Sequence, residues 1–86
     1  MNYDILVSKI KLVIFGIIKT DEDIHICYDE DLITRFGINS ITFITLMIKL
    51  EESFNVKIED ELLLPNNFNT LNKIAKYLRE QGVIDE

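Results

Sequence analysis

The chain has 86 residues, with 15 acidic and 9 basic side chains, a formal charge of −6 and 48% apolar residues. This length indicates a single domain over residues 1–86 that buries roughly 60–65% of its unfolded surface, which leaves little room for a deep enzyme cleft. The apolar content is too high for a disordered tail, and the negative charge repels nucleic acid and anionic membranes. We therefore expect a folded domain whose partners present basic surfaces.

The single cysteine, Cys27, excludes an internal disulfide and a cysteine-based zinc site. The apolar run Leu12–Ile18 has only seven residues, whereas a membrane helix needs about 20. Acidic residues follow this run in place of the small residues that end a signal peptide. We expect a cytoplasmic protein with no membrane segment, and Met1 and the acidic ending favour a free-standing chain.

The first amphipathic segment extends from about Tyr3 to Lys19. Its apolar residues have the spacing of one helical face: Leu6, Ile10, Val13, Ile14 and Ile17. From Thr20 to Asn39 no period persists, and acidic residues alternate with apolar ones. Because long loops in compact domains are uncommon, we expect this one to be pinned across the bundle, with a short helical turn near 29–34.

The second clear helix begins at Asn39–Ser40, with Asn39 as a suitable N-cap, and ends near Phe54. Its inward face consists of Phe43, Leu46, Met47, Leu50 and Phe54. A brief helix is expected at 59–64, closed by Pro65. The last helix, capped by Asn69 or Thr70 and stopped by Gly82, has the inward face Leu71, Ile74, Ala75 and Leu78. The pattern predicts an all-α four-helix bundle of three main helices and one short helix, with a long first loop.

Ser40 is placed where a long loop turns into an amphipathic helix. Its hydroxyl lies at a helix N-terminus, where backbone N–H groups and the helix dipole favour a phosphate. Gly37 allows a tight turn, and Ile38 and Ile41 flank the serine with apolar surface. In isolation such a serine is most often a helix cap or an ordinary surface residue.

The run Gly37-Ile38-Asn39-Ser40-Ile41 resembles the signature of the acyl carrier and peptidyl carrier protein family. The likeness extends from Leu6 to Leu78, including Glu51-Glu52-Ser53-Phe54 and Phe68-Asn69-Thr70-Leu71. The resemblance implies a single carrier domain, not an enzyme. Ser40, between Asn39 and Ile41, would receive 4′-phosphopantetheine from coenzyme A through a Mg²⁺-dependent phosphopantetheinyl transferase. The arm would carry acyl or aminoacyl thioesters from a loading enzyme to downstream synthase enzymes.

The face after the serine departs from the pattern of fatty-acid carriers, which place acids there. Here Thr42 and Thr45 occupy that face, and a second apolar stripe consists of Ile41, Ile44 and Ile48. These differences favour a carrier of a secondary-metabolite or nonribosomal-peptide pathway. We expect the contacts with partner enzymes to be made by Thr42, Thr45, Ile48, Glu51 and Glu52, and the chain to act as a monomer.

The same residues allow other interpretations. The main alternative is a small helical adaptor or regulator that binds a partner through the stripe Ile41, Ile44 and Ile48. His25 and Cys27 lack further ligands for a metal site or partners for nucleophilic catalysis. Residues 21–32 faintly resemble a calcium loop but lack its glycine and its final glutamate. We therefore expect no bound metal.

Overall fold

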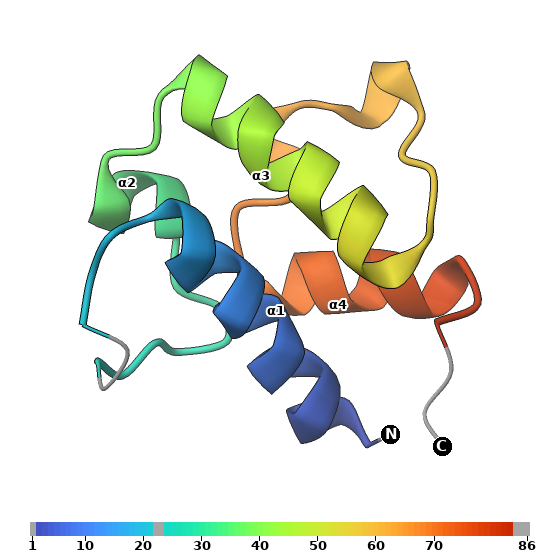
Figure 1. Ribbon diagram of the computed structural model, residues 1–86, viewed down its shortest axis with the longest axis horizontal. Helices are drawn as coiled ribbons and strands as arrows, with labels where there is room; N and C mark the ends of the chain where they lie inside the picture. The colour runs from blue at the N-terminus through green and yellow to red at the C-terminus, as the bar shows by residue number, and fades with distance from the viewer. Residues whose placement is uncertain (1, 22–23, 84–86) are drawn as a thin grey trace.

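The computed structural model describes residues 2–21 and 24–83. Its helices are α1 (Tyr3–Ile17), α2 (Leu32–Phe36), α3 (Ser40–Phe54) and α4 (Leu71–Glu80), as Figure 1 shows. Two 3₁₀ turns, η1 (Asp60–Leu62) and η2 (Pro65–Asn67), lie between α3 and α4. No strand occurs within these described ranges. The prediction of an all-α bundle with three main helices and one short helix is confirmed.

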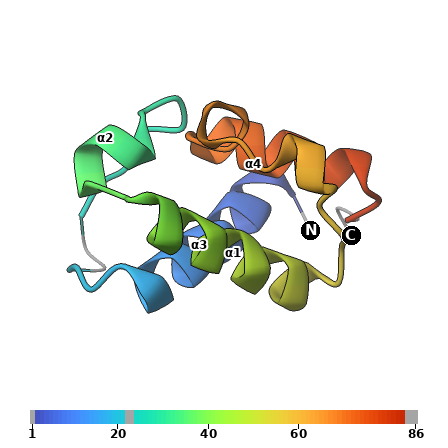
Figure 2. The same cartoon turned by 90° about the horizontal axis from the view of Figure 1, so that it is seen from above.

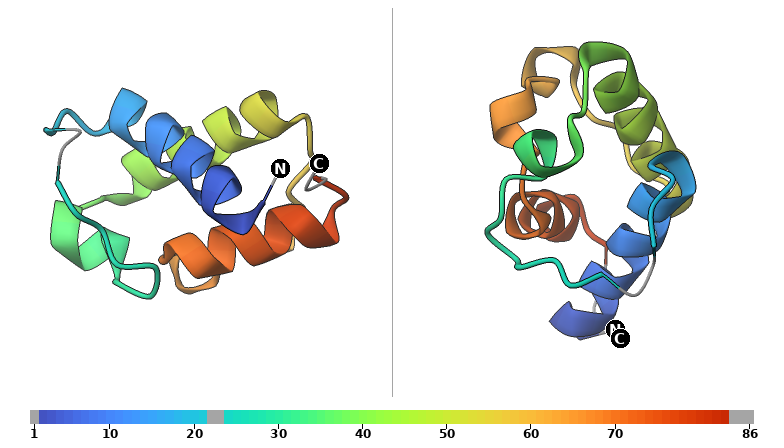
Figure 3. Two further views of the ribbon diagram at one scale, coloured as in Figure 1. Left: turned by 90° about the horizontal axis from the view of Figure 1, so that it is seen from below. Right: turned by 90° about the vertical axis from the view of Figure 1, so that its left-hand side faces the viewer.

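Helix α1 packs against both α3 and α4, and Figure 3 shows it crossing the two. Asn2 caps its start, with the side-chain oxygen accepting a hydrogen bond from the Ile5 N–H at 2.8 Å. The helix ends at Ile17, two residues earlier than predicted, because Ile18 is already extended. Val7 is fully buried although the predicted face omitted it, since a helix that contacts two neighbours buries a wider face. Val13 and Ile17 are only half-buried.

The hydrophobic core draws on all four helices and on the connections between them. Its helical members are Leu6, Val7, Ile10 and Ile14 of α1, Leu32 of α2, Phe43, Leu46, Met47 and Leu50 of α3, and Leu71, Ile74, Ala75 and Leu78 of α4. The predicted inward face of α4 is therefore confirmed, and that of α3 is confirmed except for Phe54, which is half-buried. Ile26, Ile38, Ile58 and Phe68 extend the core into the loops.

The long loop between α1 and α2 is fastened to the bundle, as predicted. Ile26 is completely buried in the core. Tyr28 donates its hydroxyl hydrogen to Asp4 at 2.6 Å, and the Tyr28 carbonyl accepts from the Asn72 N–H at 3.0 Å. Because the loop is fixed to both α1 and α4, the short helix that follows it has a defined position (Figure 2).

The short helix α2 begins three residues later than predicted, at Leu32. Asp31 is extended and serves as its N-cap, with one carboxylate oxygen accepting from the N–H groups of Ile33 at 3.0 Å and Thr34 at 3.2 Å. The Leu32 N–H donates to the Asn69 carbonyl at 2.7 Å, which connects the start of α2 to the residue before the α4 cap. The start of this helix therefore depends on a contact between distant parts of the chain.

The connection between α3 and α4 differs in detail from the single brief helix predicted at 59–64. Asn55, in the left-handed region at φ 54°, ends α3. Two 3₁₀ turns follow, and Pro65 begins the second turn where we expected it to close the first. Thr70, and not Asn69, caps α4 by accepting from the Lys73 N–H at 3.1 Å. Within the described residues, no helix is long and apolar enough to cross a membrane.

The cap at Asp31 predicts how stability depends on pH. The N–H groups of Thr34 and Ile33 lower the pKa of Asp31 by stabilising its charged form. The stabilisation is therefore complete above the ordinary aspartate pKa of about 3.9 and is lost as the pH falls through the lower folded-state value. Asp31→Asn keeps a capping oxygen but cannot titrate. We expect the stability difference between wild type and Asp31→Asn to be constant above about pH 5 and to shrink below about pH 4.

Urea unfolding of both proteins across this pH range measures that difference. Because the two proteins share all their other carboxylates, the effect of those groups cancels in the stability difference. A difference that does not change with pH would contradict the role assigned to the Asp31 charge.

Candidate functional site

The corner between α2 and α3 depends on the backbone of Gly37. This residue ends α2 in the left-handed conformation, at φ 60° and ψ 40°, and its N–H donates to the Ile33 carbonyl. The Ile38 N–H donates to the same carbonyl at 3.0 Å, and the Ile38 side chain is buried. A Cβ atom added to Gly37 would have nothing within 4 Å. Glycine is therefore required here by the dihedral angle and not by lack of space.

Asn39 caps α3, as the sequence predicted. Its backbone is extended, and its side-chain oxygen accepts from the Thr42 N–H at 2.8 Å, while its carbonyl accepts from the Phe43 N–H at 2.9 Å. The N–H groups of Ser40 and Ile41 stand in the first turn, beyond the regular hydrogen bonds of the helix. The start of α3 therefore presents two backbone donors and the positive end of the helix dipole.

Ser40 is the first residue of α3 and is exposed to solvent. Because Asn39 supplies the side-chain cap, the helix does not need the Ser40 hydroxyl for that purpose. A primary alcohol in this position can form a phosphate ester whose oxygens face the donors of the first turn. The exposed hydroxyl and its surroundings thus fit a phosphate-linked group.

The apolar stripe of Ile41, Ile44 and Ile48 lies on the solvent side of α3. These side chains are 79%, 41% and 47% exposed, respectively. The stripe begins at the residue after Ser40 and extends for roughly 10 Å along the helix. Since the stripe adds nothing to the core, it is apolar surface available to a partner.

The polar residues predicted to contact partners fall into two groups. Thr45 and Glu52 are exposed, although the Thr45 hydroxyl donates to the Ile41 carbonyl at 2.9 Å and Glu52 lies 3.7 Å from Lys49. Thr42 is half-buried. These positions leave Glu52 and the outer side of Thr45 accessible beside the stripe.

Glu51 has a structural contact that the sequence analysis missed. Its side chain is half-buried, and its carboxylate accepts from the Ile58 N–H at 2.7 Å. An acidic residue near the end of a helix is unfavourable for the dipole, and this hydrogen bond supplies a physical reason for it. The bond holds the segment after α3 against the helix, so Glu51 positions the chain that leads to the buried Ile58.

The residues considered for metal binding or catalysis are separate from this corner. His25 and Cys27 are both exposed in the first loop. Arg35 donates to the His25 carbonyl at 2.6 Å and pairs with Glu30 at 2.8 Å, which closes that loop on itself. Across residues 2–21 and 24–83, no group of three or more metal-ligating side chains lies together.

Comparison with known proteins agrees with the geometry. The sequence profile described as "phosphopantetheine attachment site" matches residues 12–78, which is most of the chain and includes the whole α2–α3 corner. A search of curated proteins found no match.

The role of Gly37 can be tested against a matched glycine. We expect Gly37→Ala to lower the free energy of unfolding by about 1–2 kcal/mol, because an L-residue is strained at its positive φ. Gly16→Ala, in helix α1, is expected to leave stability unchanged or raise it by up to about 1 kcal/mol, since an added Cβ there also meets nothing within 4 Å. Urea unfolding measures both, and equal effects of the two substitutions would contradict the dihedral argument.

Proposed function

This chain belongs to the family of phosphopantetheine attachment sites, whose cofactor is covalently bound 4′-phosphopantetheine, and on that premise we propose that Ser40 is the residue that bears it. In this proposal, the protein acts as a carrier that shuttles acyl or aminoacyl groups between biosynthetic enzymes. Domains of this family carry groups and are not themselves catalysts. The observation that supports Ser40 most directly is its exposed hydroxyl at the first residue of α3, beside a cap supplied by Asn39.

The attachment step places few demands on the carrier itself. The Ser40 oxygen forms a bond to the phosphorus that bears the pantetheine arm of coenzyme A. The pyrophosphate bond breaks, and adenosine 3′,5′-bisphosphate leaves. The serine proton passes to the transferase, which also binds the Mg²⁺. Once attached, the group supplies a terminal thiol that holds the cargo as a thioester.

The contribution of this chain is to present and position the attachment site. The N–H groups of Ser40 and Ile41 and the dipole of α3 favour the negative charge of the phosphodiester. Gly37 and the buried Ile38 set the direction of the chain into Ser40. The stripe of Ile41, Ile44 and Ile48 offers the transferase and later enzymes an apolar surface next to the arm.

We assign the carrier to the secondary-metabolite or nonribosomal-peptide type in preference to the fatty-acid type. The surface after Ser40 bears Thr42, Thr45 and exposed isoleucines in place of acidic residues. Docking on such a surface depends more on apolar contact than on charge. This assignment predicts partners whose contact surface is apolar at its centre.

A second candidate function is an adaptor that binds a partner helix through the same stripe. The exposure of three isoleucines on one helix face is the observation that favours it. In that case, the Ser40 hydroxyl would have no part in binding. The two functions therefore differ in what a substitution at Ser40 does.

Replacement of Ser40 tests the attachment site directly. Incubation of the full chain with coenzyme A, Mg²⁺ and a broad-specificity transferase is expected to add the mass of one phosphopantetheine arm. Ser40→Ala is expected to abolish this gain, whereas Ser53→Ala, an exposed serine on the same helix, is expected to retain it. Intact-mass spectrometry measures all three. Modification of Ser40→Ala, or an unmodified wild-type chain, would overturn the proposal.

The stripe is tested by placing a charge on it. We expect Ile48→Glu to lower kcat/KM for the transferase about tenfold, because the enzyme would have to bury a carboxylate against an apolar surface. The matched control is Ile5→Glu, since both isoleucines are 47% exposed but Ile5 lies on α1. Circular dichroism verifies that both variants fold. Equal rates for the two variants would exclude the outer part of the stripe from the transferase contact.

A further inference from the structure

The end of the first loop, residues 28–32, is attached to the first turn of α4 at two points. The Tyr28 carbonyl accepts from the Asn72 N–H at 3.0 Å, and the Leu32 N–H donates to the Asn69 carbonyl at 2.7 Å. Figure 2 shows this part of the loop beside the start of α4. Because the segment ends where α2 begins, its attachment to α4 determines where α2 lies.

Helix α4 leaves the Asn72 N–H available for this contact. Thr70 caps the helix by accepting from the Lys73 N–H at 3.1 Å, and the Ile74 N–H donates to the Thr70 carbonyl at 3.1 Å. The Asn72 N–H lies in the first turn, where no carbonyl of the helix itself can reach it. Its acceptor therefore comes from another part of the chain, and the loop supplies it.

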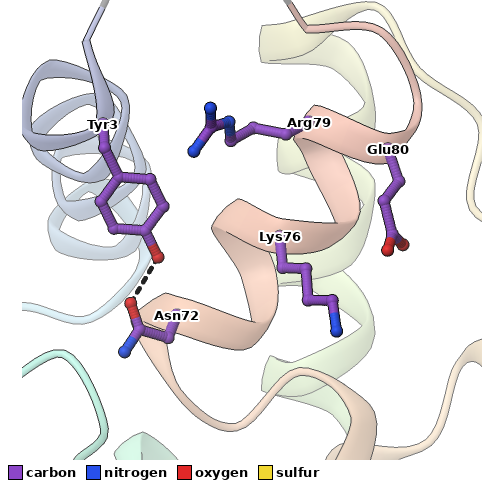
Figure 4. A pocket seen from close by; sticks show the side chains of 5 residues that line it. All are labelled: Tyr3, Asn72, Lys76, Arg79 and Glu80. Carbon is purple, nitrogen blue, oxygen red and sulfur yellow. Dashed lines mark hydrogen bonds between the residues drawn. The ribbon is translucent and has the colours of Figure 1, made fainter.

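The side chain of Asn72 joins the same loop to α1. Its Nδ2 donates to the Asp29 carboxylate at 2.6 Å, and its Oδ1 accepts the hydroxyl hydrogen of Tyr3, as Figure 4 shows for the Tyr3 contact. The guanidinium carbon of Arg79 lies 5.5 Å from the centroid of the Tyr3 ring, which helps to hold that ring in place. Because an ionised carboxylate can only accept, the Asp29 contact fixes which way the amide faces.

The chain from this segment to Ser40 is short. Helix α2 has five residues, so its position depends on tertiary contacts more than on its own stability. Gly37 ends it, and Ile38 and Asn39 alone separate Gly37 from Ser40. A displaced α2 would change the surface that an enzyme meets on one side of Ser40, while the rest of α3 would remain in the core.

We propose that Asn72 is a positioning residue for the transfer of phosphopantetheine to Ser40. It acts through residues 28–32 and α2, since its own contacts are with Tyr3, Tyr28 and Asp29. This inference rests on the function proposed above. If the transferase binds only the docked arrangement of α2, a lower population of that arrangement raises KM in proportion and leaves kcat nearly unchanged.

The contact between Asn72 and Asp29 can be broken and then restored with side chains of the same shape. Asn72→Asp places two carboxylates against each other. Adding Asp29→Asn returns one amide donor and one carboxylate acceptor, with the net charge of the wild type. An aspartate in the first turn of α4 suits the helix dipole, so these variants are expected to fold.

Transferase kinetics test the role in transfer. We expect Asn72→Asp to raise KM about fivefold with kcat within about twofold of the wild type. The double variant, and Asp29→Asn alone, are expected to lie within about twofold of the wild type, because both retain the hydrogen bond. The matched control is Asn66→Asp, which adds the same charge at an exposed residue of η2. An equal rise in KM for this control, or no recovery in the double variant, would overturn the proposal.

Hydrogen exchange of the unmodified chain separates positioning from a general loss of stability. In Asn72→Asp, we expect the N–H groups of Leu32 and Ile38 to exchange at least about tenfold faster, and the double variant to restore both rates. The Leu50 N–H, within α3, is expected to keep its rate. Equal acceleration of all three amides would indicate general destabilisation and would contradict the proposal.

The two proposals fail in different ways. A wild-type chain that is not modified would overturn attachment at Ser40, and with it any role in the transfer. A wild-type chain that is modified, together with an Asn72→Asp variant of unchanged KM, would overturn the role of Asn72 alone.

Discussion

The hydrogen bond from the Thr42 N–H to the Asn39 side chain, at 2.8 Å, determines what Ser40 can do. A side-chain acceptor at the start of a helix satisfies one of its unpaired N–H groups, and here Asn39 supplies it from the preceding residue. Ser40 consequently occupies the first helical position with an exposed hydroxyl, next to the backbone donors of the first turn. If Ser40 were itself the cap, its hydroxyl would be engaged by the helix. Because the cap is one residue earlier, capping of the helix does not compete with the attachment proposed for Ser40.

The rest of the fold fixes the direction from which the chain reaches this cap. Gly37 reverses the backbone, and Ile38 anchors the turn in the core. Helix α2 in turn is held by Asp31 and by the contact of Leu32 with the Asn69 carbonyl. A five-residue helix has little stability of its own, so its position depends on these tertiary contacts. The position of Ser40 therefore depends on how α1 and α4 pack with the first loop, whose residue Ile26 is buried in the core.

The exposed surfaces of α3 and α4 differ in polarity. Helix α3 exposes isoleucines beside the proposed attachment site, while α4 exposes the cationic side chains of Lys73, Lys76 and Arg79.

Helical periodicity indicated α1, α3 and α4 and the buried faces of Leu6, Phe43 and Leu71, because an amphipathic face depends on residues three or four positions apart. The cap at Asn39 followed from the preference of asparagine for the residue before a helix. The run from Gly37 to Ile41 indicated the candidate site only together with the helix order, length and acidity of the chain, through its resemblance to the carrier-protein signature. Only the tertiary structure decided where α2 begins, that Glu51 binds the Ile58 N–H, and that Tyr3 meets Asn72 across 69 residues of sequence. Those contacts join segments that the fold brings together, and no local pattern records which distant donor will reach which acceptor.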